Sequence, residues 1–239
     1  MIAVETGMVL AAGLGTRLRP ITETLPKPLV MVRGRTLLDR ALDHLEAVGV
    51  KRAVVNAHYK AEMIERHLAS RERPEVVLSR EARLLDTGGG VAEALPRLEE
   101  PFYVINSDAV WVDGPVPALT RLARAFDPER LDAVLLVHET VWAVGYEGLG
   151  DFFLDPWGMP RRRLEREVVP YLFAGVQLLS RRLFEGEESG AFSMNRLWDK
   201  AMEKGRILCL VHDSAWFDVG TPEGLAATEA RLAERYPSI

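Results

Sequence analysis

The stretch of the chain with the most chemical content joins an apolar run to a glycine-rich loop and two cations. It covers residues 10–29 and reads LAAGLGTRLRPITETLPKPL. Gly13 and Gly15 let successive backbone N–H groups converge on an anion. Arg17 adds a planar, permanently charged group, and Lys27 stands between two prolines that stiffen the chain around a point charge. This combination predicts a cradle for phosphate groups.

Two better-known phosphate-binding motifs do not fit this loop. A dinucleotide-binding fingerprint would need Gly or Ala where the chain has Leu18, and a P-loop needs a Gly-Lys-Ser/Thr tripeptide that is absent from the sequence. A plain glycine-rich turn followed by an exposed loop would explain two glycines. It does not explain the spacing from Gly13 through Arg17 to Lys27.

Two aspartates lie where a metal ion could meet those phosphates. Asp108 follows an apolar strand expected at residues 102–106, and parallel sheets bind ligands beyond the carboxyl ends of their strands. Asp218 interrupts the apolar run Trp216–Val219, where an acid is costly unless it is paired or bound to a metal. Taken singly, each aspartate is explained equally well as a helix N-cap or a turn residue. Together they predict a Mg²⁺ site, since Mg²⁺ takes one or two carboxylates plus phosphate oxygens and water.

These motifs resemble the signature of the sugar-phosphate nucleotidyltransferases, which make nucleotide sugars from a nucleoside triphosphate and a sugar 1-phosphate. The landmarks extend to about residue 225 and cover nearly the whole chain. Within this family the resemblance is nearest to the uridylyltransferases that act on N-acetylmuramic acid 1-phosphate in peptidoglycan recycling, although similar chains are also often described as mannose-1-phosphate guanylyltransferases. Besides the first loop, the landmarks are Asp86–Gly90, Asn106–Trp111, Tyr171–Gly175 and Trp216–Thr221.

The resemblance implies roles for individual residues on the nucleotide side. Arg17 and Lys27 are expected to be catalytic as well as nucleotide-binding, and Asp108 and Asp218 to hold the metal. Glycines just before a helix allow a flat base to approach free N–H groups. Glu81 is expected either to contact the base or to be an exposed loop acid. The predicted nucleotide-binding set is Leu10, Ala11, Ala12, Gly13, Gly15, Thr16, Arg17, Lys27, Glu81, Gly88 and Gly89.

The resemblance also places residues 171–175 against the sugar ring, where Gly175 in an apolar strand suggests a close approach of backbone to ligand. Several relatives grip the sugar phosphate with a lysine of a Glu-Lys-Pro element, which this chain replaces by the run RLERE. Either an arginine of that run, Arg163 or Arg166, or a second metal at Asp218 is expected to do this work. The predicted sugar-binding set is Asn106, Gly150, Glu165 and Gly175.

The elements that must position these residues alternate between short apolar runs and amphipathic segments, which predicts strand–helix crossovers and a mainly parallel sheet. Strands are expected at residues 8–12, 53–56, 75–78, 102–106, 133–137, 171–179 and 206–211. Helices are expected at residues 36–48, 61–70, 90–98, 116–126, 194–204 and 222–235, with a loop or hairpin insertion at 145–158.

This pattern predicts an α/β protein with one doubly wound, mainly parallel (mixed) sheet, and the resemblance implies a Rossmann-like, GT-A-like nucleotidyltransferase fold. We expect a single domain over residues 1–239, with a nucleotide-binding half up to residue 140 and a sugar-binding half from residue 141. With 48% hydrophobic and 27% charged residues, the composition is that of a folded globular protein.

The composition also bears on partners and location. The formal net charge is −5 and no contiguous face is basic, so we expect no nucleic-acid partner. No apolar run approaches the ~20 residues of a membrane span, and the first residues have no basic region typical of a signal peptide. Cys209 is the only cysteine, which suits a reducing compartment. We expect a cytoplasmic protein that is a monomer or a small homo-oligomer.

Two classes of function remain after this reading. The first is an enzyme in which a sugar 1-phosphate attacks the α-phosphorus of a nucleoside triphosphate in line, with UTP as the preferred nucleotide and mannose 1-phosphate with GTP as the alternative pair. The second is a catalytically silent nucleotide-sugar sensor. Such sensors tend to lose the metal acids or the charged loop residues. Because Arg17, Lys27, Asp108 and Asp218 are all present, the sequence favours the enzyme.

Overall fold

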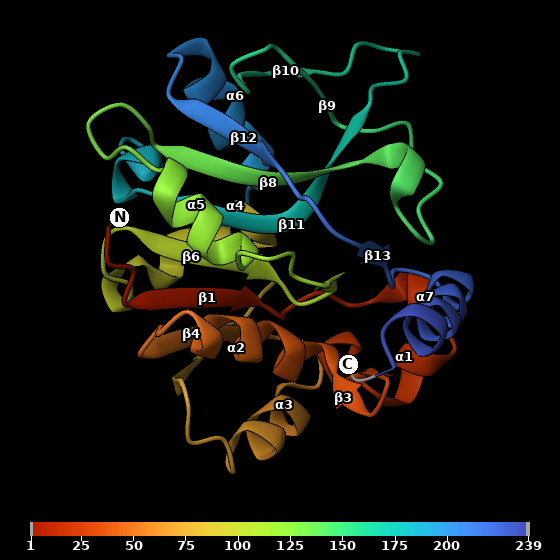
Figure 1. The fold of residues 1–239 in the computed structure, drawn as a ribbon. Coiled ribbons are helices and arrows are strands. Elements are labelled where there is room, and N and C mark those ends of the chain that lie inside the picture. The colour runs from red at the N-terminus through yellow and green to blue at the C-terminus, as the bar shows by residue number, and fades with distance from the viewer. Residues whose placement is uncertain (1, 238–239) are drawn as a thin grey trace.

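A nine-stranded mixed sheet forms the centre of the computed structural model, which describes residues 2–237 (Figure 1). The main path through the sheet has the order β10-β9-β11-β6-β1-β4-β5, and β8 lies between β11 and β12. Two small ribbons, β13-β7 and β2-β3, lie outside this sheet.

The strands are short and the helices span one to four turns. The strands are β1 (Thr6–Leu10), β2 (Met31–Val32), β3 (Arg35–Thr36), β4 (Arg52–Ala57), β5 (Glu75–Arg80), β6 (Phe102–Asn106), β7 (Ala109–Trp111), β8 (Ala133–Glu139), β9 (Phe152–Leu154), β10 (Pro160–Arg162), β11 (Tyr171–Leu179), β12 (Ile207–Val211) and β13 (Trp216–Asp218). The helices are α1 (Ile21–Thr24), α2 (Leu37–Ala47), α3 (Ala61–Leu68), α4 (Asp86–Ala94), α5 (Ala118–Ala125), α6 (Met194–Glu203) and α7 (Pro222–Arg235).

The strands of the first half run parallel, so their carboxyl ends meet at one edge of the sheet. β1 pairs in parallel with β4 and β6, and β4 pairs in parallel with β5. The second half is joined to the same sheet through β11, which runs antiparallel to both β6 and β8. The parallel edge is therefore where a ligand of this fold is expected to bind.

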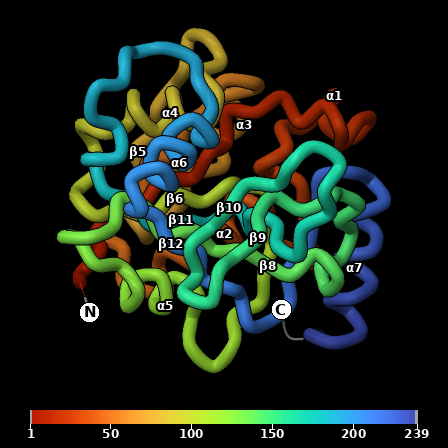
Figure 2. Tube along the Cα trace, turned by 90° about the horizontal axis from the view of Figure 1, so that it is seen from above, coloured from red at the N-terminus to blue at the C-terminus, as the bar shows by residue number. Residues whose placement is uncertain are grey.

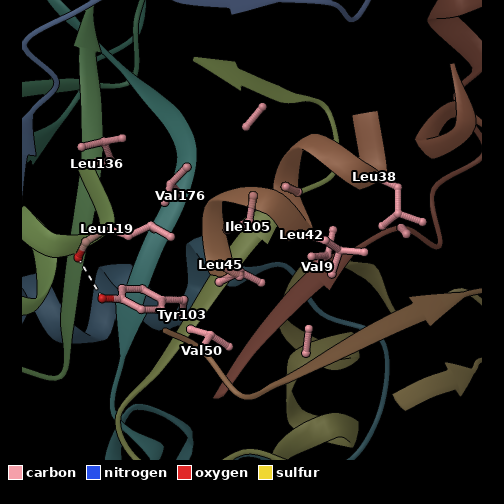
Figure 3. Packing of buried hydrophobic residues seen from close by; sticks show 14 of the residues in the cluster. Val9, Leu38, Leu42, Leu45, Val50, Tyr103, Ile105, Leu119, Leu136 and Val176 are labelled. Atoms are coloured by element: carbon pink, nitrogen blue, oxygen red, sulfur yellow. Dashed lines mark hydrogen bonds between the residues drawn. The ribbon is translucent and has the colours of Figure 1, made fainter. Parts of the chain in front are cut away.

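Helices cover both faces of the sheet because each has one apolar stripe. The α2 helix begins at the N-cap Thr36, whose hydroxyl accepts a hydrogen bond from the Asp39 amide, and its fully buried leucines pack on β1 and β6 (Figure 3). Helices α3 and α5 contribute to the same core, in which the Tyr103 hydroxyl donates to the Leu119 carbonyl at 2.8 Å. The α4 and α6 helices pack together on the other face (Figure 2).

The predicted strands and helices are all present, with three informative differences. Strand β1 begins two residues earlier than expected and ends at Leu10, so the glycine-rich loop starts at Ala11. Helix α4 begins at Asp86, four residues before its expected start. The insertion expected at residues 145–158 contains β9 and continues into β10, and the two strands form a hairpin that extends the edge of the main sheet. Within residues 2–237, no helix combines the length and apolar character that a membrane crossing requires.

Candidate active site

A cavity of about 510 Å³ opens at the carboxyl edge of β1, β4 and β6, and most of the predicted nucleotide-binding residues line it. The sequence-predicted residues in its wall are Leu10, Ala11, Ala12, Gly13, Gly15, Thr16, Arg17, Lys27, Glu81, Asn106 and Asp108. The wall also contains residues outside the predicted binding sets: Pro28, Asn56, Leu84, Asp86, Thr87, Ser107, Ala191 and Gly220.

The glycine-rich loop is held in shape by local hydrogen bonds and by a left-handed glycine. The Ala11 amide donates to Asn56 Oδ1 at 2.8 Å, and the Thr22 hydroxyl donates to the Gly15 carbonyl at 2.8 Å. Gly15 has φ +64°, and a Cβ there would lie 3.0 Å from the Lys27 Cβ. The loop therefore folds back so that the exposed residues Thr16 and Arg17 and the half-buried Lys27 border the same cavity.

Lys27 and Asp108 form an ion pair across this cavity. Lys27 Nζ lies 2.7 Å from Asp108 Oδ2, with 12% and 33% of the two side chains exposed. Burial acts to raise the pKa of Asp108, but the charge of Lys27, its hydrogen bond, the backbone amide and the more distant Arg17 together lower that pKa below its ordinary value. The carboxylate is thus kept ionised, as a metal ligand must be.

The β7–β13 ribbon brings the second aspartate to the same place. Its antiparallel register sets Asp218 opposite Ala109, the neighbour of Asp108. Asp218 Oδ1 accepts a hydrogen bond from the Gly220 amide at 2.8 Å. A Cβ at Gly220 would lie 2.8 Å from Asp218 Oδ1 and 3.1 Å from Arg17 Nη2. Arg17, Lys27 and Asp108 line the cavity, whereas Asp218 lies just outside its wall and is connected to it through Gly220.

The donor set at Asp108 and Asp218 suits a magnesium ion that is completed by its substrate. Residues 2–237 contain no group of three or more His, Cys, Asp and Glu side chains arranged to hold a metal. Mg²⁺ is commonly bound by one or two carboxylates together with phosphate oxygens and water. Asp108 and Asp218 supply that number of carboxylates beside the phosphate cradle, so the residues fit the ion that the sequence predicts.

Glu81 is a buried acid and not an exposed loop residue. It is 6% exposed, its Oε1 accepts from Asn56 Nδ2 at 2.6 Å, and its Oε2 accepts from the Leu85 amide at 3.2 Å. Asn56 thus connects Glu81 to the Ala11 amide of the glycine-rich loop. Sequence reasoning missed Asn56, although a polar residue that closes an otherwise apolar strand was the available signal.

The prediction that Gly88 and Gly89 precede a helix and offer free N–H groups is wrong. Both glycines lie inside α4, and both amides donate to the Phe192 carbonyl, at 2.9 and 3.1 Å. A Cβ at Gly88 would lie 2.4 Å from the Phe192 ring, and a Cβ at Gly89 would lie 2.1 Å from the Gly190 carbonyl oxygen. The missing side chains of these glycines therefore allow the segment before α6 to pack closely against α4. Asp86 and Thr87, and not the glycines, border the cavity.

A smaller cavity of about 270 Å³ adjoins the first and shares Asp86, Thr87 and Asn106 with it. Of the predicted sugar-binding residues, only Asn106 lines it. The remaining residues of its wall come from the hairpin, β11 and the start of α6: Asp151, Phe173, Gln177, Ser193, Met194, Asn195 and Trp198. Among these, only Phe173 belongs to a segment, residues 171–175, that the resemblance places against the sugar ring.

The other predicted sugar-side residues lie outside both cavities. Gly175 sits at a bulge of β11 with φ +78°, and a Cβ there would lie 2.8 Å from the Ala109 Cβ, so its bare backbone approaches protein and not a ligand. Gly150 packs in the same way against the Val169 carbonyl. Glu165 is exposed, and neither Arg163 nor Arg166 borders either cavity.

Comparison with known proteins places these observations in a family. The family model described as the MobA-like NTP transferase domain matches residues 7–217. The chain belongs to this family. The matched residues contain every segment that lines the nucleotide cavity except Gly220, together with the whole wall of the smaller cavity.

Individual relatives narrow the activity within the MobA-like NTP transferases. The chain is 40% identical over 238 residues to N-acetylmuramate alpha-1-phosphate uridylyltransferase of Caulobacter vibrioides, covering 97% of this chain and 98% of that protein. The enzyme of the same name from Neisseria meningitidis is 34% identical over 219 residues, covering 90% and 92%. This chain is accordingly a nucleotidyltransferase of the kind that acts on sugar 1-phosphates, and not a silent sensor.

Solved structures support the fold. UDP-glucose pyrophosphorylase in complex with UDP-glucose superimposes with a TM-score of 0.79 at 16% identity, covering 98% of this chain and all of that one. HddC from Yersinia pseudotuberculosis superimposes with a TM-score of 0.75 at 24% identity, covering 95% and 99%. Both confirm the predicted Rossmann-like α/β fold with its mixed central sheet.

Proposed function

We propose that the protein transfers a uridylyl group from UTP to N-acetylmuramic acid 1-phosphate, with release of pyrophosphate, as a cytoplasmic step of peptidoglycan recycling. The sugar phosphate oxygen attacks the α-phosphorus directly, so no covalent intermediate with the enzyme is needed. The observation that carries this proposal is one cavity lined by the glycine-rich loop, Lys27 and Asp108, with Asp218 beside its wall, in a chain similar to two uridylyltransferases of that name.

Under this proposal, the chain's own groups position the triphosphate and neutralise its charge. The amides of the loop from Gly13 to Thr16 would face the phosphate groups, and the exposed Arg17 follows directly. Lys27 is held at the opposite side by its 2.7 Å contact with Asp108. Fixed charges of this kind stabilise the charge that develops on the phosphates without needing to reorganise during the reaction.

Asp108 and Asp218 would hold Mg²⁺ at this cavity. The ion would supply charge neutralisation and would orient the attacking and leaving oxygens. The lowered pKa of Asp108 supports this role because the carboxylate stays ionised well into acid. Lys27 occupies one oxygen of Asp108, so binding of the triphosphate offers the lysine a second anionic partner while the carboxylate binds the metal.

The base is proposed to lie near Glu81 and Thr87, where the cavity runs toward the start of α4. The sugar is proposed to occupy the smaller cavity, since Asn106, Asp86 and Thr87 belong to both walls. In this arrangement residues up to 140 provide most of the nucleotide site, and later residues complete the sugar site. Arg163 and Arg166, which were predicted to grip the sugar phosphate, line neither cavity. Asp218 is also outside both walls, but its neighbour Gly220 lines the larger cavity, so we assign this task to a metal held there.

A substrate panel tests the proposal. Pyrophosphate release is measured with UTP, GTP, CTP and ATP, each against N-acetylmuramic acid 1-phosphate, N-acetylglucosamine 1-phosphate, glucose 1-phosphate and mannose 1-phosphate. We expect the highest kcat/KM for UTP with N-acetylmuramic acid 1-phosphate. A clear preference for GTP with mannose 1-phosphate would replace this pair with the alternative, which relatives such as the 28% identical mannose-1-phosphate guanylyltransferase catalytic subunit beta of Danio rerio keep open.

A further inference from the structure

The smaller cavity contains a buried amide whose orientation is fixed. Gln177, the only glutamine of the chain, lies on β11 and is 1% exposed. The indole N–H of Trp198 can only donate, so the atom that it contacts at 2.9 Å is Gln177 Oε1. The amide nitrogen, Nε2, is therefore directed away from Trp198.

This amide nitrogen has no hydrogen-bond partner among residues 2–237, and the residue that carries it lines the cavity. Among the hydrogen bonds within residues 2–237, Gln177 makes only the one to Trp198 through its side chain. Nε2 is not sealed by surrounding protein atoms either, and Gln177 forms part of the cavity wall. A buried N–H donor without a partner is unfavourable unless a ligand or water accepts from it. The Gln177 amide N–H is thus a fixed hydrogen-bond donor for an acceptor atom of a ligand bound in the cavity.

An apolar surface lies beside this donor. Phe173 and Trp198 meet edge to face with ring centroids 4.6 Å apart, and both line the cavity together with the buried Met194. A methyl group would lose its water shell against this surface, which favours its binding. A hydrogen-bond donor and an apolar wall in one small cavity match a group that combines a carbonyl oxygen with a methyl.

The charged side chains in the wall of the smaller cavity are acidic, which disfavours a carboxylate of the sugar in this space. Its ionisable lining residues are Asp86 and Asp151, and its wall contains no lysine or arginine. A carboxylate in this space would face two acids of like charge, whereas a neutral group would not. Asp151 Oδ2 accepts from the Phe173 amide at 2.7 Å, which holds the carboxylate in place for an N–H donor of the ligand.

We propose that this cavity selects the acetamido group of an N-acetylated sugar 1-phosphate. The acetamido carbonyl oxygen accepts from Gln177 Nε2, its N–H donates to Asp151, and its methyl packs on Phe173 and Trp198. Trp198 is also a positioning residue, because its indole N–H fixes the Gln177 amide. The inference rests on the proposed function, since it concerns the sugar of the same reaction. Any carboxylate on the sugar must point out of this cavity.

The test compares sugars that differ in the acetamido group. The two pairs are N-acetylglucosamine 1-phosphate against glucose 1-phosphate, and N-acetylmuramic acid 1-phosphate against its N-deacetylated form. For each pair that turns over, we expect Gln177→Met to lower the wild-type preference for the acetylated sugar about tenfold, through the loss of one hydrogen bond. The KM for the nucleotide should change less than twofold, which a general structural defect would not allow.

Trp198→Phe provides a second variant that keeps Gln177 and the aromatic wall. It should lower the preference for the acetylated sugar about threefold, because the Gln177 amide is then free to turn. Gln177→Glu keeps the acceptor for the Trp198 indole N–H but loses the N–H donor toward the sugar. Unchanged preference in Gln177→Met, or a wild type without preference, would overturn this inference while nucleotidyl transfer stands. Absence of pyrophosphate release with every sugar would instead contradict the proposed function.

Discussion

The nucleotide cavity takes about half of its lining from one continuous stretch between Leu10 and Pro28, whereas the sugar-side cavity takes its lining from five separate segments. In the first, the wall is formed largely by a glycine-rich loop, so the sequence that forms the loop also forms this part of the cavity. In the second, side chains from β6, β11, α4, α6 and the hairpin segment converge only after the chain has packed. The lining residues of the larger cavity are therefore concentrated in one stretch of the sequence, whereas those of the smaller cavity are spread over the chain.

The largest effect is expected at Lys27, where the nucleotide side concentrates its charge. Lys27→Ala should lower kcat by roughly 1000-fold, because it removes a fixed charge from the phosphates and leaves Asp108 without its partner. Steady-state pyrophosphate release measures the effect. Lys51→Ala, which removes an exposed lysine paired with Glu5, is the matched control and should retain wild-type activity. A kcat within tenfold of wild type in Lys27→Ala would contradict the role proposed for Lys27 at the triphosphate.

A somewhat smaller loss is expected at Asp218, which links the two sides. Asp218→Asn should lower kcat about 100-fold and raise the Mg²⁺ concentration needed for half-maximal activity, since one metal carboxylate is lost. Binding of Mn²⁺ in the presence of nucleotide, followed by electron paramagnetic resonance, gives a readout independent of turnover. Asp127→Asn, outside both cavities, controls for the loss of a charge. Equal Mn²⁺ affinity in Asp218→Asn and wild type would contradict the metal assignment.

Gly175 tests whether a predicted sugar residue has a structural role instead. Gly175→Ala should lower the free energy of unfolding by about 2 kcal/mol, from left-handed strain plus contact with Ala109. Gly34→Ala isolates the strain, because Gly34 has nearly the same φ, +77°, and a Cβ there would meet no atom within 4 Å. It should cost about 1 kcal/mol. Urea unfolding measures both; a selective rise in the sugar KM with unchanged stability would return Gly175 to the sugar site.

His212 lies away from both cavities and should affect stability alone. Burial, with help from the nearby His138, lowers its pKa to about 4. Below the ordinary histidine pKa the unfolded chain then binds a proton that the folded protein does not, so stability falls as the pH falls from about 6.5 toward 4. In that window wild type should lose about 1 kcal/mol more per pH unit than His212→Gln, measured by urea unfolding at pH 7, 6 and 5. Parallel pH dependence in both proteins would contradict this.

The fold and the phosphate cradle were largely predictable from the sequence. Alternating apolar and amphipathic segments reflect the burial of strands and helices directly, and Gly13, Arg17 and Lys27 lie close together in the chain. Asp108 and Asp218 were predictable as a pair because each stands beside apolar residues at the end of a strand. Their closeness in space depends on the β7–β13 ribbon, whose three-residue strands leave little periodicity to read.

The sugar side could not be predicted in the same way. Gly150 and Gly175 draw attention as glycines in or near strands, but only the folded structure shows that their missing side chains make room for protein. Gln177 carries only the signal of a single polar residue in an apolar strand, and Trp198 carries none because it lies on the buried stripe of α6. Their hydrogen bond joins elements that are separate in sequence, and it exists only after packing.

Pyrophosphate release from UTP and N-acetylmuramic acid 1-phosphate tests the central claim most directly. With both substrates and Mg²⁺ present, wild type should release pyrophosphate and form the nucleotide sugar in equal amounts, with neither product when the sugar phosphate is omitted. Lys27→Ala should abolish most of both products. Pyrophosphate or phosphate release that does not depend on any sugar phosphate, or equal rates in wild type and Lys27→Ala, would contradict the account.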